Sequence, residues 1–409
     1  MTRQRYFFYI LILGTLTTLG PFSIDMYLPG FPAIARYLHT STAEVALSLS
    51  SFFIGISAGQ LIYGPLLDRF GRKRPLYAGL VIYIMASVGC ILVKTIDQLV
   101  ILRFVEAIGS CAAAVASVAM VRDLFPVKDN AKVFALLMLV VGVSPMIAPA
   151  VGGYVTAAFG WQWVFIILAG IALIILVVVF FSLPESYTPD PTFSMKPRNI
   201  LKNFGAVIIE PQFYTYAVSG AFAFSGLFAY VAASPLVFMD VFKVNGKTYG
   251  LIFALLSIGF IGSSQVNSVL LRRFSSQQII PVALSTQVIV ALVFVIGASL
   301  HWYNMVATIG MIFLFLCCVG MTNPNAAALS LAPFSRNAGT ASSLMGAMQL
   351  GIGALASIGV GMFSAYSALP MAGIMAMTSV LALLVFLFGR RQITSSCETD
   401  PLAETVLIH

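Results

Sequence analysis

Apolar stretches of about twenty residues follow one another along almost the whole chain, separated by short polar segments. A helix needs about 20 apolar residues to cross the roughly 30 Å hydrocarbon core of a bilayer. Of the 409 residues, 60% are hydrophobic and only 9% are charged, so a soluble fold would lack polar residues to cover its core. The stretches are continuous rather than alternating, which favours helices over a β-barrel. We therefore expect an all-α membrane protein with twelve spanning helices.

One polar segment interrupts this pattern near the middle of the chain. Residues 184–211 contain prolines and both signs of charge, and we interpret them as a cytoplasmic linker. The predicted organisation is an N-terminal six-helix bundle at 1–183, a C-terminal six-helix bundle at 212–390 and a cytoplasmic tail at 391–409. The predicted spans lie near 6–29, 44–66, 75–94, 98–121, 131–157, 162–183, 213–239, 248–271, 279–300, 303–326, 337–364 and 369–389.

The positive charges are distributed unevenly over the connections between the predicted spans. Seventeen of the 22 Lys and Arg residues fall on the side that carries both chain ends, and four fall on the opposite side. Positive residues accumulate on the cytoplasmic side of membrane proteins. We therefore expect both termini in the cytoplasm. The net charge of +8 reflects this topology and does not indicate binding to nucleic acid.

The most specific motif is the loop after the second predicted span. Residues 64–76 read Gly-Pro-Leu-Leu-Asp-Arg-Phe-Gly-Arg-Lys-Arg-Pro-Leu. The two glycines permit a tight turn, and Asp68 lies among four cations, so a charge network between helices is available. Charges that only set the topology would explain the Arg and Lys residues, but neither Asp68 nor the glycine spacing. This loop resembles the hallmark motif of the major facilitator superfamily. The resemblance implies two six-helix bundles that rock around a central cavity, with a conformational-switch loop formed by Gly64, Asp68, Arg69, Gly71 and Arg72.

Four further stretches are similar to the drug:proton antiporter branch of that superfamily. Leu99-x-x-x-Arg103 matches its intramembrane arginine motif, although Glu106 and Ala107 replace the usual Gln and Gly. The fifth span is close to the antiporter motif through Gly142, Pro145, Pro149, Gly152 and Gly153. The resemblance implies that this motif forms a gasket between the two halves. Residues 24–29 and 339–343 resemble the Bcr/CflA subfamily, which includes bicyclomycin resistance proteins. The resemblance implies proton-coupled efflux of small molecules or drugs across the bacterial inner membrane.

Asp25 and Arg103 are charged residues within or beside the apolar stretches, where a charge costs at least about 2.5–3.5 kcal/mol. The helical rise places Asp25 roughly 27 Å from the inner end of its span and Arg103 roughly 8 Å from the outer end of its own. An ion pair between them is therefore feasible. Two other interpretations stay open: Glu106 neutralises Arg103 from the same helix face, or Asp25 lies in a wet interface. We assign Asp25, Arg103 and Glu106 to proton coupling.

Polar and aromatic side chains inside the spans are candidates for the substrate cavity, because buried amides face protein or water rather than lipid. Ordinary packing is the alternative for each aromatic ring. The candidates are Tyr27, Phe222, Phe228, Tyr230, Asn267, Asn323, Asn325 and Gln349.

The expected partners are a small-molecule substrate, protons and the lipid bilayer, and we expect a monomer without a cofactor or a metal. The five cysteines are odd in number and scattered, and the three histidines are far apart. The Gly-Lys-Thr at 246–248 lacks the first glycine of a phosphate-binding loop, so we expect no ATP-driven enzyme. A metabolite exporter and a proton symporter for a nutrient are alternative functions, and a sensor or scaffold that transports nothing is a third.

Overall fold

The structure, a computed structural model, describes residues 3–125, 127–187, 189, 204–334, 338–362 and 367–393. These residues contain twelve helices that are long and apolar enough to cross a membrane, which confirms the expected number. The first candidate span runs through three elements: α1 (Arg3–Asp25), the short helix η1 (Leu28–Gly30) and α2 (Phe31–Tyr37). Asp25 is therefore the last residue of α1, just before the chain bends.

The remaining helices of the first half are α3 (Thr42–Phe70), α4 (Lys73–Ile91), α5 (Ile96–Leu124), α6 (Val127–Phe159) and α7 (Gln162–Ser182). The second half contains α9 (Pro211–Pro235), η2 (Leu236–Val241), α10 (Gly246–Leu270), α11 (Ser276–Ser299), α12 (Met305–Leu331), α13 (Ala338–Gly361), α14 (Leu369–Gly389) and η3 (Arg390–Gln392). The expected tail beyond residue 393 and most of the expected linker, at 188 and 190–203, lie outside the described residues.

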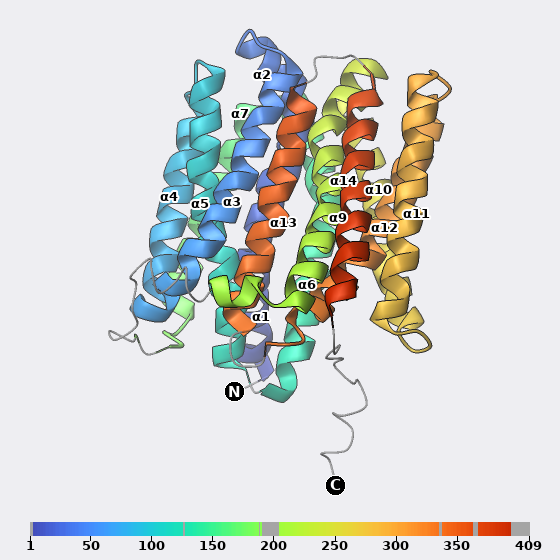
Figure 1. The fold of residues 1–409 in the computed structure, drawn as a ribbon. Helices are drawn as coiled ribbons and strands as arrows, with labels where there is room; N and C mark the ends of the chain where they lie inside the picture. The colour runs from blue at the N-terminus through green and yellow to red at the C-terminus, as the bar shows by residue number, and fades with distance from the viewer. Residues whose placement is uncertain are drawn as a thin grey trace.

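Side-chain caps explain where several of these helices begin. Ser41 and Thr95 accept hydrogen bonds from backbone N–H groups in the first turns of α3 and α5, and Asn245 and Asn304 do the same for α10 and α12. Such caps satisfy N–H groups that have no partner inside the helix. All four helices start at the end of the molecule opposite the start of α1 and the end of α14 (Figure 1). We call these two ends the far end and the termini end.

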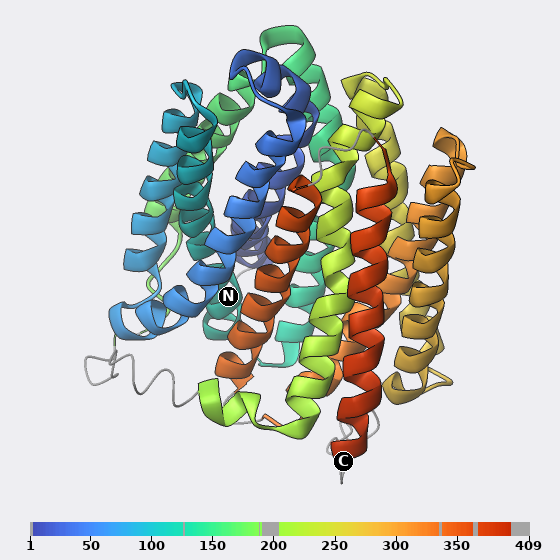
Figure 2. The same ribbon diagram turned by 45° about the horizontal axis from the view of Figure 1, so that its top comes forward.

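The helices form two bundles that contact each other along two seams. One seam joins α3 to α13, and the two helices run side by side in both views (Figures 1 and 2). The other joins α6 to α10. At the α3–α13 seam the Ser50 and Ser357 hydroxyls lie 2.6 Å apart, and Ser57 donates to the Ala347 carbonyl at 2.8 Å.

Among the described residues, the buried apolar core crosses between the two halves near the far end. Near the far end, one apolar cluster contains residues of both halves, including Tyr27 and Phe53 from the first and Phe228 and Tyr249 from the second. Near the termini end, the described residues divide into separate clusters for each half. The far end is therefore packed shut, while the halves separate toward the termini end.

Candidate functional site

Asp25 lies where the two halves meet near the far end. Its side chain is only 5% exposed. Within the described part of the chain it has no ion pair and no side-chain hydrogen bond. The helix η1, which begins three residues later, contacts α9 and α10 of the second half, the helices that carry Tyr230 and Tyr249. A buried carboxyl group at the junction of the halves thus has no cation to neutralise it.

Arg103 is wholly buried on α5 and is neutralised within its own helix. Its guanidinium donates to the Glu106 carboxylate at 2.7 Å, and both side chains are 0% exposed. A second nitrogen of Arg103 donates to the Ser23 carbonyl of α1 at 2.9 Å. The ion pair with Asp25 that the sequence made feasible is absent among the described residues, and the alternative pairing with Glu106 is the one observed.

Aromatic rings and hydroxyl groups complete the surroundings of this pair. The guanidinium carbon of Arg103 lies 4.1 Å from the ring centre of Phe52 and 4.6 Å from that of Tyr27, distances typical of cation–π contacts. Ser87 of α4 donates to the second oxygen of Glu106 at 2.8 Å. The Arg103–Glu106 pair therefore joins α1, α4 and α5 inside the first half, and Tyr27 packs against it instead of lining an open cavity.

The seal at the far end rests on glycines of the predicted antiporter motif. A Cβ atom on Gly152 of α6 would overlap the Met26 carbonyl oxygen, and one on Gly153 would lie 2.5 Å from the Gly246 carbonyl oxygen of α10. A Cβ atom on Gly250 of α10 would likewise lie 2.7 Å from the Cα of Ala150 on α6. Only glycine allows such an approach of two backbones. Pro145 and Pro149 lie within the same helix, and Gly142 has ordinary room, with Ile261 as its nearest neighbour at 3.7 Å.

The predicted substrate-contact residues of the second half occupy two kinds of position. Phe228 packs edge-to-face on Phe53 across the junction, with ring centres 4.5 Å apart, and Tyr230 stacks on Phe253 of α10 at 5.6 Å. Phe222 packs beside a cluster of the second half near the termini end.

The four predicted amides are hydrogen-bonded in pairs. Asn325 of α12 donates to Asn267 of α10 at 2.7 Å, and Gln349 of α13 donates to Asn323 of α12 at 2.9 Å. The first pair is almost fully buried, whereas the second is half-buried. The amides therefore join helices of the second half, and the structure does not gather all the predicted contact residues around one cavity.

The predicted switch loop lies at the termini end and forms a charge network. Arg72 donates to Asp68 at 2.8 Å and to Asp123, at the end of α5, at 2.7 Å. Burial opposes the charge of the guanidinium, but the hydrogen bonds and charges of Asp123 and Asp68 outweigh it and raise the pKa of Arg72. Gly71 has φ = 83°, a left-handed conformation that glycine adopts without strain. Of the other predicted loop residues, Gly64 has open space beside it, and Arg69 lies over the ring of its neighbour Phe70.

Glu185, which follows α7 at the start of the expected linker, completes this network. Its two carboxylate oxygens accept from the backbone N–H groups of Arg72 and Lys73, at 2.7 and 3.1 Å, where α4 begins. A carboxylate at this position satisfies free N–H groups and complements the positive end of the helix dipole. The beginning of the linker is thereby fastened to the switch loop.

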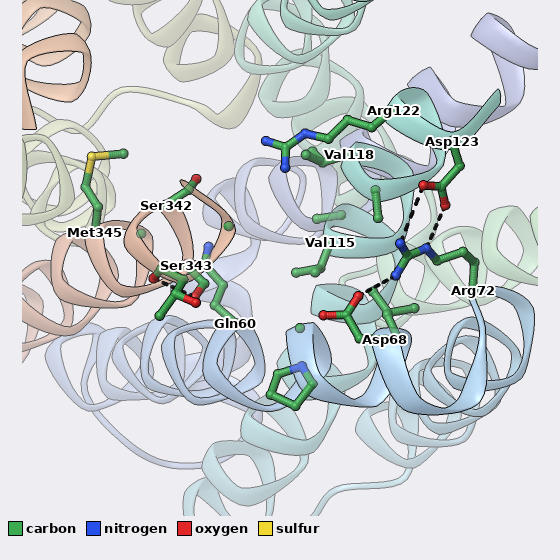
Figure 3. Close-up of a pocket in the computed structure, with 18 of the residues that line it drawn as sticks. Gln60, Asp68, Arg72, Val115, Val118, Arg122, Asp123, Ser342, Ser343 and Met345 are labelled. Carbon is green, nitrogen blue, oxygen red and sulfur yellow. Dashed lines mark hydrogen bonds and ion pairs between the residues drawn. The ribbon is translucent and has the colours of Figure 1, made fainter. Parts of the chain in front are cut away.

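A cavity of about 560 Å³ opens at the termini end between α3, α5 and α13. Its polar lining includes Gln60 and Asp68 of α3, Arg122 of α5, and Ser342 and Ser343 of α13. Figure 3 shows Arg122 directed into the space between α5 and α13, whereas Asp123 turns toward Arg72. Arg122 forms no ion pair with any residue that the structure describes. The volume lies in the range of small-molecule sites.

Sequence reasoning missed several members of these sites. Asp123, Glu185 and Arg122 are charged residues near helix ends, where charge is ordinary, so no local signal separated them from topology. The described residues contain no group of three His, Cys, Asp or Glu side chains that is arranged to hold a metal ion.

Twelve spanning helices in two bundles, packed shut at one end and hollowed at the other, define a polytopic membrane transporter. The family model described as Major Facilitator Superfamily matches residues 13–358. The chain therefore belongs to the Major Facilitator Superfamily, as the loop at 64–76 predicted.

Relatives and solved structures agree with this membership. The chain is 30% identical to the "Bicyclomycin resistance protein homolog" of Haemophilus influenzae, over 95% of this chain and 98% of that one. It is 31% identical to the "Uncharacterized MFS-type transporter YdgK" of Bacillus subtilis, over 92% and 94%, and 29% identical to the "Multidrug resistance protein MdtL" of Escherichia coli, over 91% and 93%.

Two solved structures share the fold. One is a bacterial homolog of the human lysosomal transporter Spinster, with a TM-score of 0.76 and 16% identity, covering 98% of this chain and 100% of that chain. The other is a D-xylose-proton symporter, with a TM-score of 0.72 and 15% identity, covering 93% and 97%.

Proposed function

We propose that the protein exports small molecules, drugs among them, across the bacterial inner membrane in exchange for protons. In this proposal both termini are cytoplasmic, the protein works as a monomer, and the cavity at the termini end opens to the cytoplasm. The names of the relatives from H. influenzae and E. coli, which refer to bicyclomycin and to multidrug resistance, support a drug as substrate.

The observation that carries the proposal is the burial of Asp25 at the closed far end without a cation. Burying an ionised carboxylate that has no partner is very costly, whereas a protonated carboxyl group costs far less. The closed far end is therefore compatible with protonated Asp25 and opposes the ionised form. Because the same residue lies at the junction of the halves, its protonation biases which end of the transporter is open.

The resulting cycle has four steps. With the far end open, Asp25 takes a proton from the outside, and the neutral side chain allows the far end to close. The inner cavity then opens, and Asp25 releases its proton to the cytoplasm as substrate enters past Gln60 and Arg122. Ionised Asp25 disfavours the closed far end, so the far end reopens and substrate leaves to the outside. One proton moving down 100 mV supplies about 2.3 kcal/mol, enough for a roughly 50-fold substrate gradient.

Arg103 and Glu106 have a different part in this proposal from the one that the sequence suggested. As a neutral buried pair they need not change protonation during the cycle. The hydrogen bond from Arg103 to the Ser23 carbonyl fixes the end of α1, two residues before Asp25. We therefore assign Arg103 and Glu106 to positioning Asp25. Proton coupling is assigned to Asp25 alone.

A transport assay with purified protein in proteoliposomes tests the proposal. A panel of labelled drugs is screened first in a bacterial host that lacks its own pumps, and an active compound is then used as substrate. Antiport predicts that an inward proton gradient drives the compound outward and that a protonophore abolishes accumulation. Reversal of the pH gradient should reverse the net flux. Substrate that moves in the same direction as protons would identify a symporter, and a protein that moves none of the panel would contradict drug export.

A further inference from the structure

Tyr27, Tyr230 and Tyr249 are buried in the cluster that joins the halves, and Tyr83 is buried inside the first half. Three of these four tyrosines share one arrangement. Tyr27, Tyr83 and Tyr249 each share a hydrogen bond with a serine hydroxyl, at 2.6–2.7 Å. The serine partners are Ser48, Ser23 and Ser234, and each of them donates its own hydrogen to a carbonyl three or four residues earlier. Because a serine hydroxyl has only one hydrogen, the tyrosine must be the donor in each pair. The hydrogens of these three phenols are therefore already committed.

Tyr230 is the exception. Its side chain is 2% exposed, and its hydroxyl oxygen is buried without any hydrogen-bond partner in the described chain. Buried polar groups in folded proteins almost always have a partner, in the protein or in ordered water, because an unsatisfied one is costly. The ring itself is held firmly by its stacking on Phe253. Tyr230 is thus a fixed phenol with a free donor.

Asp25 is the matching group on the other half. It is buried and has no side-chain partner among the described residues, and the helix η1, which begins three residues later, contacts α9 and α10, the helices of Tyr230 and Tyr249. Tyr249 already donates its hydroxyl hydrogen to Ser234. Of these two phenols, Tyr230 is therefore the one that is free to donate to the carboxyl group. Backbone contacts between the halves hold the surrounding junction closed, with Gly246 of the second half against Gly153 and beside Pro29 of the first.

We propose that Tyr230 is a positioning residue that donates a hydrogen bond to the Asp25 carboxyl group, directly or through one water molecule, and so fastens the closed far end. This inference rests on the proposed role of Asp25 and extends it by naming the partner on the second half. A protonated carboxyl group accepts such a bond on its carbonyl oxygen and keeps its own proton. Breaking the bond releases the α1 end from α9 when the far end opens.

Other titratable groups near Asp25 interact with partners of their own. On α5 the Arg103–Glu106 pair is self-neutralising, and on α10 Lys247 lies over the ring of Tyr154 of α6 at 5.6 Å. α7, which also contacts α1, contains no charged residue. Nearby, the phenols of Tyr27, Tyr83 and Tyr249 are paired with serines, and the Cys90 thiol is buried.

The test measures closure of the far end as a function of pH, without any substrate. Spin labels are placed at Lys94→Cys and Trp302→Cys, both exposed near the far end of opposite halves, in a chain whose native cysteines are replaced. The protein is reconstituted in nanodiscs, and the distance between labels is recorded from pH 5 to pH 9. The background protein should close on acidification, and Asp25→Asn should remain closed at every pH.

Tyr230→Phe keeps the ring and removes only the hydroxyl group. Loss of one net hydrogen bond weakens closure about three- to tenfold, so the midpoint of closure should move about 0.5–1 pH unit toward acid. Tyr249→Phe is the matched control and should leave the midpoint within about 0.2 unit. In an Asp25→Ala background, Tyr230→Phe should have no further effect, because a double-mutant cycle isolates the pair.

The outcomes separate this inference from the proposed function. If Tyr230→Phe leaves the midpoint unchanged or moves it toward alkaline pH, the phenol has no partner in the closed state and the inference is wrong. An equal effect of Tyr249→Phe would overturn the inference as well, because that phenol already donates to Ser234. If Asp25→Asn still opens and closes with pH as the background does, the proposed role of Asp25 fails, and the inference fails with it.

Discussion

The Arg103 guanidinium and the Glu106 carboxylate form a completely buried ion pair at 2.7 Å, and the pair leaves Asp25 alone. Removing one partner of such a pair leaves an uncompensated charge in a medium that cannot solvate it. The pair therefore holds α1, α4 and α5 together while adding no net charge. In the proposed mechanism the roles are accordingly divided between a neutral pair that holds the helices and a single carboxyl group that carries the proton.

The glycines of α6 provide a matched pair for testing the far-end seal. Gly153→Ala places a methyl group against the Gly246 carbonyl oxygen of the second half, and because backbone cannot move aside cheaply the far end should fail to close. We expect transport to fall at least about tenfold and labels at positions 94 and 302 to stay apart at acid pH. Gly142→Ala, whose methyl group would meet only Ile261 at 3.7 Å, should retain transport within about twofold. Equal loss in both variants would contradict a seal at Gly153.

The two carboxylates that Arg72 contacts should differ in their contribution to stability. Asp123 is 15% exposed and Asp68 is 44% exposed, so water screens the second contact more strongly. Asp123→Asn should lower the free energy of unfolding by about 1–3 kcal/mol, and Asp68→Asn by less than about 1 kcal/mol. Thermal unfolding in detergent checks the order. A larger loss from Asp68→Asn would show that the exposed contact dominates the network.

The cap that Glu185 places on α4 should depend on hydrogen bonding more than on charge. Glu185→Ala leaves the Arg72 and Lys73 N–H groups without their acceptor and should cost about 0.5–2 kcal/mol of stability. Glu185→Gln keeps one acceptor oxygen and should cost about half as much or less. Hydrogen exchange at the first turn of α4 measures the effect locally. Unchanged exchange in the alanine variant would mean that water replaces the carboxylate without loss.

The fold could be predicted from the sequence because hydropathy and charge act locally. Each spanning helix must satisfy its own backbone, so an apolar run of sufficient length identifies it without knowledge of its neighbours. The caps at Ser41, Thr95, Asn245 and Asn304 are equally local. The first span differed most from the prediction, since the membrane segment does not end at residue 29 but bends after Asp25 and continues to Tyr37.

The site could be predicted only in part, because its partners come from distant segments. The spacing of Asp68 and Arg72 indicated a network, but Asp123 and Glu185 reach it through the packing of α5 and α7, which no local pattern encodes. That the Tyr230 hydroxyl lacks an acceptor also depends on tertiary packing, because packing decides which tyrosines lie beside a serine hydroxyl. For Asn267 and Asn325, polarity inside a span indicated a partner but did not reveal that each is the partner of the other. Their contact with substrate stays a prediction.

Drug-driven proton flux in proteoliposomes that contain Asp25→Asn tests the central claim most directly. Asparagine has nearly the same shape as aspartic acid but cannot release a proton, so the variant should fold and bind drug. Binding of labelled drug should persist, whereas proton movement in response to a drug gradient should disappear. Proton flux at the wild-type rate would show that another group carries the proton, and the assignment of proton coupling to Asp25 would then be wrong.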